Sequence, residues 1–257
     1  MLAPAPDRTA RAPASGPLRF ARYAYGPNRL GLCGPDDAAA LFGEATLGGD
    51  DRHLRELARG FDSAYPYLAL IARSNGIEDP LAASVVEAYW LGGPLVEAVT
   101  PNQLGESLRT RFRPRLRLAV FADLRDAAPA GSKPVHAFHV LDVFPKVGLL
   151  RSEQANDVLE TMDRCRIRWG RVVERIGDEL VVRAVPLELV EGKLALGAPR
   201  IERITAFRDG RGFIADVEPG DVVSIHWDWA CDVLDGPALE RLVATTVREM
   251  EIANRTI

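Results

Sequence analysis

The sequence pattern changes at Cys165, and this change constrains the fold more than any other feature. After Cys165, short runs rich in Val, Ile and Leu alternate with turn sequences such as Gly177-Asp178 and Pro219-Gly220-Asp221. Short strands at this spacing, with no helical pattern between them, are typical of a small antiparallel β-structure. We therefore expect residues 165–257 to contain a small antiparallel OB-like β-barrel.

The chain finishes with a run that has helical spacing. Pro237-Ala238-Leu239-Glu240 places a proline in the first turn, and Asp235 stands where a helix cap is expected. The amphipathic pattern continues to about Ala253. The sequence thus predicts a C-terminal helix that follows the strands.

The first half of the chain is mainly helical in pattern. Apolar residues recur at helical spacing between residues 54 and 74, 79 and 91, and 100 and 113. Two short runs, RLRLAVFADL from Arg115 and PVHAFHVLDVFP from Pro134, are rich in β-branched or aromatic residues, which favours a hairpin or two buried strands. Ser152 to Arg164 again has a helical pattern, with Ser152 at the cap.

These patterns predict an α+β protein built in two parts. The expected parts are a disordered tail (1–17), a mainly helical domain of unknown role (18–150), a connecting helix (151–164), and a barrel with a C-terminal helix (165–257).

Composition excludes several classes of partner. A net charge of -4 gives no electrostatic field that would attract nucleic acid. The sequence has no run of about 18 apolar residues, so it predicts no membrane span. The three cysteines, Cys33, Cys165 and Cys231, are odd in number and widely spaced, which does not suggest a disulfide framework. We expect a cytoplasmic protein with reduced thiols.

Three motifs in a fixed order carry a resemblance to a known family. They are Cys165-Arg166-Ile167-Arg168-Trp169-Gly170, then Pro219-Gly220-Asp221-Val222-Val223-Ser224-Ile225-His226, then Trp229-Ala230 leading into Leu234-Asp235. In this order and spacing the segment 165–257 resembles the HypC/HupF family of [NiFe]-hydrogenase assembly chaperones. The resemblance does not cover residues 1–164, and Cys165 is internal, whereas the family's cysteine follows the initiator methionine.

The resemblance implies a site and a role. Cys165 and His226 would be the metal ligands, and the cargo would be an iron fragment with cyanide and carbonyl ligands, held transiently. The implied partners are a hydrogenase large subunit precursor or another maturation protein. A carrier of this kind needs no catalytic turnover, so the resemblance favours a chaperone or scaffold over an enzyme.

The residues themselves give partial support to this site. Alternation along VVSIHWDW puts Ser224, His226 and Asp228 on one polar strand face, where Asp228 could accept the ring N–H of His226 and fix its tautomer. Arg164 and Arg166 flank Cys165, and nearby cations favour a thiolate. The plainer alternatives are a surface histidine without a ligand role and a cysteine that only fills core volume.

Two other hypotheses stay open at this point. One is an accessory enzyme with a site built from Cys33, His136 and His139 in the helical domain, acting in ligand synthesis for the same cofactor. His136 and His139 would point to opposite faces of a strand, and Cys33 precedes a helix whose dipole would lower the thiol pKa. No phosphate loop, His-Glu-x-x-His run or nucleophile elbow occurs. The remaining hypothesis is an interaction module that carries no metal.

Overall fold

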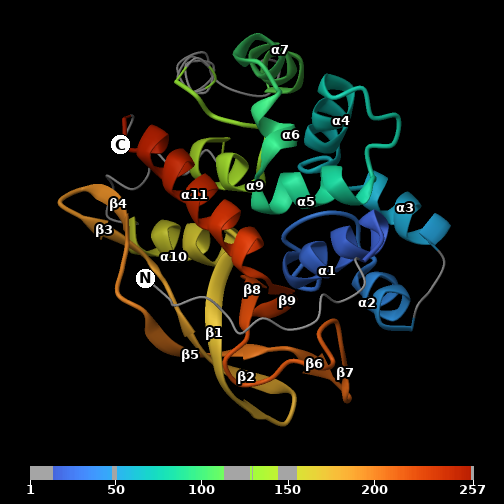
Figure 1. The fold of residues 1–257 in the computed structure, drawn as a ribbon, viewed down its shortest axis with the longest axis vertical. Coiled ribbons are helices and arrows are strands. Elements are labelled where there is room, and N and C mark those ends of the chain that lie inside the picture. Colours follow the sequence, from blue (N-terminus) through green and yellow to red (C-terminus); the bar gives the residue numbers. More distant parts are fainter. Residues whose placement is uncertain (1–13, 48–50, 113–127, 129, 144–154, 256–257) are drawn as a thin grey trace.

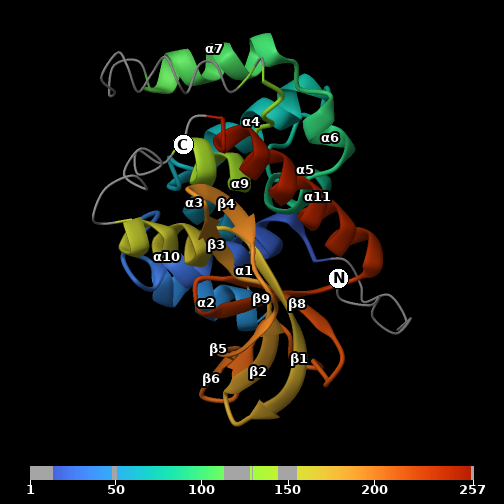
Figure 2. The same ribbon diagram turned by 90° about the vertical axis from the view of Figure 1, so that its left-hand side faces the viewer.

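Strands and helices gather at different ends of the molecule. The computed structural model describes residues 14–47, 51–112, 128, 130–143 and 155–255. The strands of the second half of the chain lie at one end, most helices lie at the other, and the C-terminal helix runs between them (Figure 1). Turned by 90°, the molecule shows helix α7 (Pro101–Phe112) at the end opposite the hairpin formed by β1 (Arg168–Ile176) and β2 (Glu179–Ala184) (Figure 2). The prediction of an α+β protein is confirmed.

The helical elements come mostly from the first half of the chain. They are α1 (Gly16–Asn28), α2 (Ala38–Leu47), α3 (Asp51–Arg59), α4 (Tyr65–Ser74), α5 (Ala83–Leu91), α6 (Pro94–Glu97), α7 (Pro101–Phe112), α9 (His136–Phe138), the π-helix η1 (His139–Val143), α10 (Ala155–Cys165) and α11 (Gly236–Ala253).

Helix α1 was not predicted. The expected disordered tail extended through residue 17, but α1 already begins at Gly16, and residues 1–13 lie outside the described part of the chain. The Ser15 hydroxyl accepts a hydrogen bond from the Leu18 N–H at 3.3 Å, and Pro17 lies in the first turn. A serine cap followed by proline is a helix-start signal that could have been recognised in the sequence.

The other helical predictions agree with the structure with one exception. The helices α5, α7 and α11 lie where spacing placed them, and Asp235 caps α11 by accepting the Ala238 N–H at 2.7 Å. The run from residue 54 to 74 is divided into α3 and α4, because the chain turns between Gly60 and Ala64. The predicted cap Ser152 lies outside the described residues.

The strand predicted from Pro134 is wrong. Residues 136–143 are helical, as α9 and η1. Their apolar residues Phe138, Val140, Leu141 and Val143 are all buried, and a segment buried on every side shows no strand or helix periodicity. The companion run from Arg115 falls on residues that the structure does not describe.

The strands follow the turn signals. They are β1 (Arg168–Ile176), β2 (Glu179–Ala184), β3 (Leu187–Val190), β4 (Lys193–Leu196), β5 (Arg200–Thr205), β6 (Phe207–Arg208), β7 (Arg211–Gly212), β8 (Val222–His226) and β9 (Trp229–Leu234).

Five of these strands pair in the order β1, β2, β5, β9, β8, and β8 returns to β1. All pairs in this sheet are antiparallel except one parallel bridge between Thr205 of β5 and Trp229 of β9, which completes the ring of strands. The pairs β3–β4 and β6–β7 form separate two-stranded ribbons. Strand β1 begins at Arg168, three residues later than predicted, because Cys165 still belongs to α10.

One apolar core extends from the helical half into the strands. Helix α1 packs on β8 and β9, where the Tyr25 ring meets the Trp229 ring edge to face at 4.7 Å between centroids. A second cluster joins η1, α10, the β3–β4 ribbon and α11. The division of the chain into domains near residues 150–165 stays a prediction, since the two halves share their main core.

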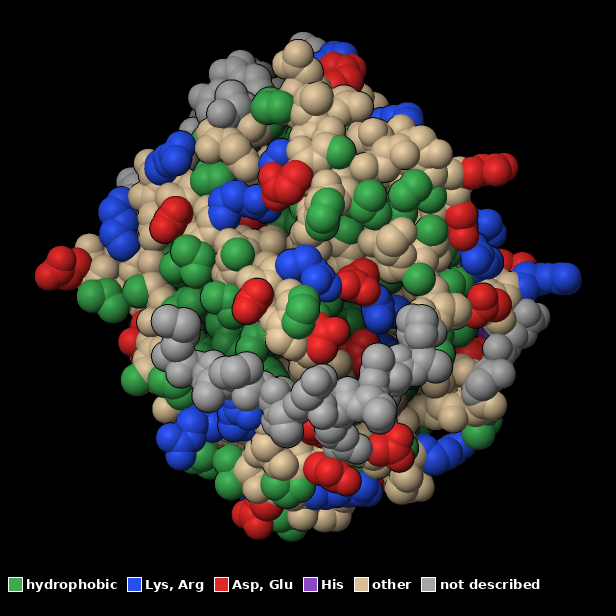
Figure 3. Space-filling model, viewed as in Figure 1, with side chains coloured by type: hydrophobic (Ala, Val, Ile, Leu, Met, Phe, Trp, Pro, Cys, Tyr) green, Lys and Arg blue, Asp and Glu red, His purple; other side chains and the backbone are tan. Residues whose placement is uncertain are grey.

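The face of the molecule drawn in Figure 3 shows no dominant charge among the described residues. On the face drawn in Figure 3, acidic and basic side chains are interspersed among apolar ones. Within the described residues, no helix is both long and apolar enough to cross a membrane.

A glycine allows the close approach of α1 to β8. A Cβ atom on Gly26 would collide with the carbonyl oxygen of His226 and touch Trp229. We expect Gly26→Ala to lower the free energy of unfolding by about 1–3 kcal/mol, the usual cost of overpacking, as measured by urea denaturation.

Gly43→Ala is the matched control for this substitution. Gly43 lies inside α2, and nothing lies within 4 Å of the position its Cβ would take. This change should be neutral or stabilising by up to about 1 kcal/mol. Equal effects of the two substitutions would contradict the packing account.

Candidate metal centre

Three potential metal ligands converge where three elements end or begin. His136 is the first residue of α9, Cys165 is the last of α10, and His226 is the last of β8. One ligand atom from each residue lies within 4.8 Å of the others. In the part of the chain that the structure describes, no other three or more His, Cys, Asp or Glu residues converge in this way. We call these three residues the His-Cys-His cluster.

His226 has one nitrogen bonded and the other without a hydrogen-bond partner. Its side chain is buried, and Nδ1 lies 2.7 Å from the backbone carbonyl oxygen of Tyr23 in α1. A carbonyl oxygen only accepts hydrogen bonds, so Nδ1 carries the proton and Nε2 keeps its lone pair. Nε2 is buried and makes no hydrogen bond. The fold thus fixes the tautomer that a metal ion would bind through Nε2.

His136 is held at both ring nitrogens. Nε2 donates to the carbonyl oxygen of Cys165 at 2.7 Å, and Nδ1 lies 3.3 Å from the hydroxyl oxygen of Tyr89, which donates to it. The His136 and His226 rings meet edge to face, with their centroids 4.8 Å apart. The two histidines come from opposite halves of the chain but lie in direct contact.

Aromatic side chains from α1 and α5 surround the two imidazoles. The Trp90 ring lies 4.9 Å from that of His136 and 5.8 Å from that of His226, centroid to centroid, and stacks on Tyr23 at 5.3 Å. Tyr89 and Trp90 follow the helical pattern of residues 79–91 like other core aromatics, and the helix that carries Tyr23 was not predicted. No local sequence signal distinguishes an aromatic side chain beside a site from one in the core.

Burial keeps both imidazoles of the cluster neutral. It lowers the pKa of His136 to about 4. The pKa of His226 falls well below the ordinary value because of burial and then of the neighbouring His136 ring, while the hydrogen bond to the Tyr23 carbonyl opposes the shift. A neutral imidazole is the form that binds metal ions.

The charges around Cys165 differ from the sequence-based expectation. Arg164 pairs with Glu160 at 2.8 Å and with Asp228 at 3.0 Å, and Arg166 pairs with Asp163 at 2.8 Å. Each of these cations is therefore neutralised by a carboxylate. It favours the thiolate form of Cys165 less than the sequence pattern predicts.

Asp228 is not the hydrogen-bond partner of His226. The expected alternation along VVSIHWDW ends at His226, since Trp227 has a left-handed backbone (φ 55°) and Asp228 turns toward Arg164. His226 lies in the interior rather than on a polar surface. The Tyr23 carbonyl takes the role predicted for the Asp228 carboxylate.

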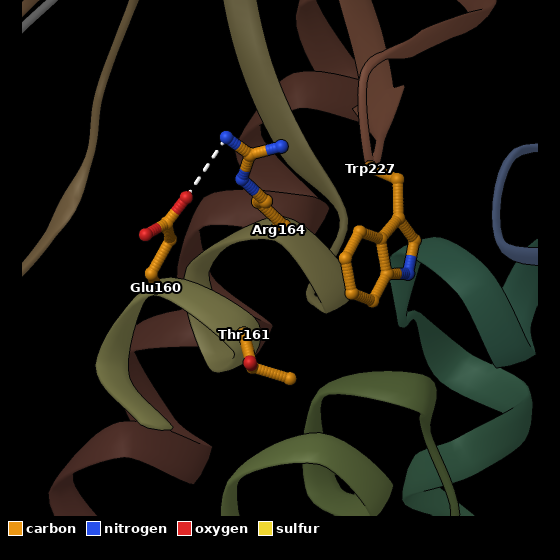
Figure 4. Close-up of a pocket in the computed structure, with 4 residues that line it drawn as sticks. All are labelled: Glu160, Thr161, Arg164 and Trp227. Atoms are coloured by element: carbon orange, nitrogen blue, oxygen red, sulfur yellow. Dashed lines mark ion pairs between the residues drawn. The ribbon is translucent and has the colours of Figure 1, made fainter. Parts of the chain in front are cut away.

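A cavity of about 300 Å³ lies beside the cluster. Its walls are Glu160, Thr161 and Arg164 of α10, with the Trp227 indole facing them (Figure 4). Arg164 directly precedes Cys165, and Trp227 directly follows His226. The backbone N–H of Trp227 donates to the backbone carbonyl of Arg164 at 2.7 Å. Two of the lining residues are therefore sequence neighbours of cluster residues, although neither Cys165 nor His226 lines the cavity.

Two secondary candidates lie apart from the cluster. The Sγ atom of Cys33 lies 3.0 Å from the Ser63 hydroxyl oxygen, and burial raises the Cys33 pKa, so the predicted lowering of this pKa is wrong. His139 Nδ1 lies 3.4 Å from the Tyr67 hydroxyl oxygen, and burial lowers the His139 pKa to about 3. Neither residue completes a three-ligand group with His136 in the described structure.

The fold and the cluster define an α+β protein in which a helical half and a strand half bring together one partly buried cysteine and two buried histidines. The chain belongs to DUF6390, a family of unknown function, whose profile matches residues 12–257. No curated protein and no solved structure matches the chain. The family match spans both halves, so both halves belong to its common architecture.

The buried neutral histidines predict acid sensitivity. An unfolded chain takes up protons at histidine near pH 6.5, whereas folded His136 does so only near its pKa of about 4. The unfolded state therefore binds more protons between these values, and stability falls as the pH falls through this window. For His136 alone the loss is about 3 kcal/mol, from 1.36 kcal/mol per pKa unit.

Urea denaturation of chelator-treated protein at pH 7, 5.5 and 4.5 checks this prediction. His136→Gln should show a shallower loss of stability on acidification than the unmodified chain. His53→Gln is the control, because His53 is only partly buried and is bonded to Glu44, which raises its pKa. An unchanged acid dependence in His136→Gln would contradict the neutral buried state.

Proposed function

We propose that this protein is an assembly chaperone of the HypC/HupF type for [NiFe]-hydrogenase. In this proposal it docks on a hydrogenase precursor or another maturation protein and transiently holds an iron fragment with cyanide and carbonyl ligands. Cys165 and His226 bind the fragment. The protein carries its cargo between partners and performs no catalytic turnover.

The convergence of Cys165 and His226 is the observation that supports this proposal most. The two residues are far apart in the sequence, and the motif resemblance alone named them as a pair. The fold brings a ligand atom of each within 4.8 Å of the other. It also leaves the Nε2 lone pair of His226 without a hydrogen bond in a buried position.

The donors suit a low-spin iron fragment. A thiolate donates electron density to iron, a neutral imidazole completes the coordination, and small strong-field ligands occupy the remaining positions. The aromatic walls formed by Trp90 and Tyr23 exclude water from the imidazoles. Cys165 is only partly buried, which leaves a route for transfer of the cargo to a partner.

The strand half supports the same assignment at the level of architecture. A ring of five short strands followed by one long helix agrees in order with an OB-like barrel and its C-terminal helix. In our proposal the helical half supplies a second docking surface for the partner. The mixed surface charge fits docking on a protein better than on nucleic acid.

Infrared spectroscopy of protein isolated anaerobically from its native host tests the proposal. We expect cyanide and carbonyl stretching bands and a hydrogenase large subunit that co-purifies with the chain. Cys165→Ala should abolish the bands, because it removes the sulfur ligand, while leaving the fold intact.

Cys33→Ala is the matched control, since Cys33 is also a partly buried thiol but bonds to Ser63. It should keep both bands. A protein without bands or metal that still binds the subunit would be an interaction module and would contradict the carrier role. Turnover lost in Cys33→Ala but kept in Cys165→Ala would instead indicate an accessory enzyme.

A further inference from the structure

The predicted metal ligands both lie in the segment 165–257, but the structure adds a histidine from the other half of the chain. We infer that His136, Cys165 and His226 together form a binding site for a single divalent transition-metal ion. The inference rests on the proposed function only in taking Cys165 and His226 as ligands, and it adds a third protein ligand that the resemblance does not contain.

The geometry around His226 indicates a ligand. Its Nε2 atom is buried without a hydrogen bond, which is costly for a polar atom unless something binds it. A ligand atom of Cys165 and a ring nitrogen of His136 both lie within 4.8 Å of the His226 ligand atom. A metal ion with bonds of about 2.0–2.3 Å would bring all three within bonding distance after small side-chain movements.

His136 suits this role through either ring nitrogen. If Nδ1 binds the metal, Nε2–H keeps its hydrogen bond to the Cys165 carbonyl. If Nε2 binds it, Nδ1–H donates to the Tyr89 hydroxyl oxygen, because a hydroxyl can accept as well as donate. In both cases the second nitrogen has a partner that orients the ring, as is usual for metal-bound histidine.

The ligand set selects a class of metal. One thiolate and two imidazoles suit Zn²⁺, Co²⁺ or Fe²⁺ and do not suit Mg²⁺ or Ca²⁺, which prefer oxygen ligands. Three protein ligands also leave a coordination position for an exchangeable group.

Metal binding at this site would join three separate segments. The ligands begin α9, end α10 and end β8. An ion held by all three would fasten the helical half to the strand half. Metal binding should therefore raise the thermal unfolding temperature of the whole chain.

Anaerobic titration of the full-length protein with Co²⁺ tests the inference. We expect one Co²⁺ per chain, a thiolate-to-cobalt charge-transfer band in the near ultraviolet, and a higher unfolding temperature. His136→Gln should weaken Co²⁺ binding by at least about tenfold, because loss of even an outer partner of a ligand costs that much. Cys165→Ser should remove the charge-transfer band.

His139→Gln is the matched control. His139 is the next histidine of the same helical segment and bonds to Tyr67 rather than to the cluster. It should bind Co²⁺ as the unmodified protein does. Circular dichroism of the metal-free variants checks that each is folded.

Two outcomes would overturn the inference: no Co²⁺ binding by the unmodified protein, or equal affinity in folded His136→Gln. If His136→Gln does not fold, X-ray absorption spectroscopy of the cobalt-loaded unmodified protein identifies the metal ligands instead. One sulfur and two imidazole ligands support the three-residue site, and a single imidazole overturns it. An intact cobalt site in a protein that never carries cyanide or carbonyl would contradict the proposed cargo but not this inference.

Discussion

The hydrogen bond from His226 Nδ1 to the Tyr23 carbonyl links the end of β8 to helix α1, and the site depends on it. Helix α1 reaches this position because Gly26 lets its backbone approach the His226 carbonyl. The same contact buries His226, fixes its tautomer and places the Tyr23 ring against Trp90. A packing contact between the two halves of the chain thus sets the chemistry of the cluster.

Much of the architecture could be predicted from the sequence, because its signals are local. Turns such as Gly177-Asp178 separate the strands, and Asp235 with the proline after it marks the start of α11. The segment from Pro134 could not be assigned correctly, because Phe138, Leu141 and their neighbours are buried on all sides and the pattern has no period. Helix α1 was missed although Ser15 and Pro17 signalled its start.

Only part of the candidate site could be predicted from the sequence, and the reason differs from that for the helices and strands. Motif order named Cys165 and His226, which the fold brings together. It did not name His136, which was a candidate only together with Cys33 and His139 in the helical half, and strand geometry separated it from His139. The error over Asp228 has a similar origin, because alternation was extended past the point where Trp227 takes a left-handed backbone. Contacts between distant segments carry no local pattern and need the fold to be seen.

The neutrality of the buried histidines has a consequence for charge balance. A divalent ion in the cluster would meet one anionic ligand, the thiolate of Cys165, and two neutral ones. One positive charge would then stay uncompensated beside the aromatic rings of Trp90 and Tyr23, where an isolated charge is costly. The exchangeable ligand in the open coordination position should therefore be an anion, and a cyanide-bearing fragment brings such a ligand with it.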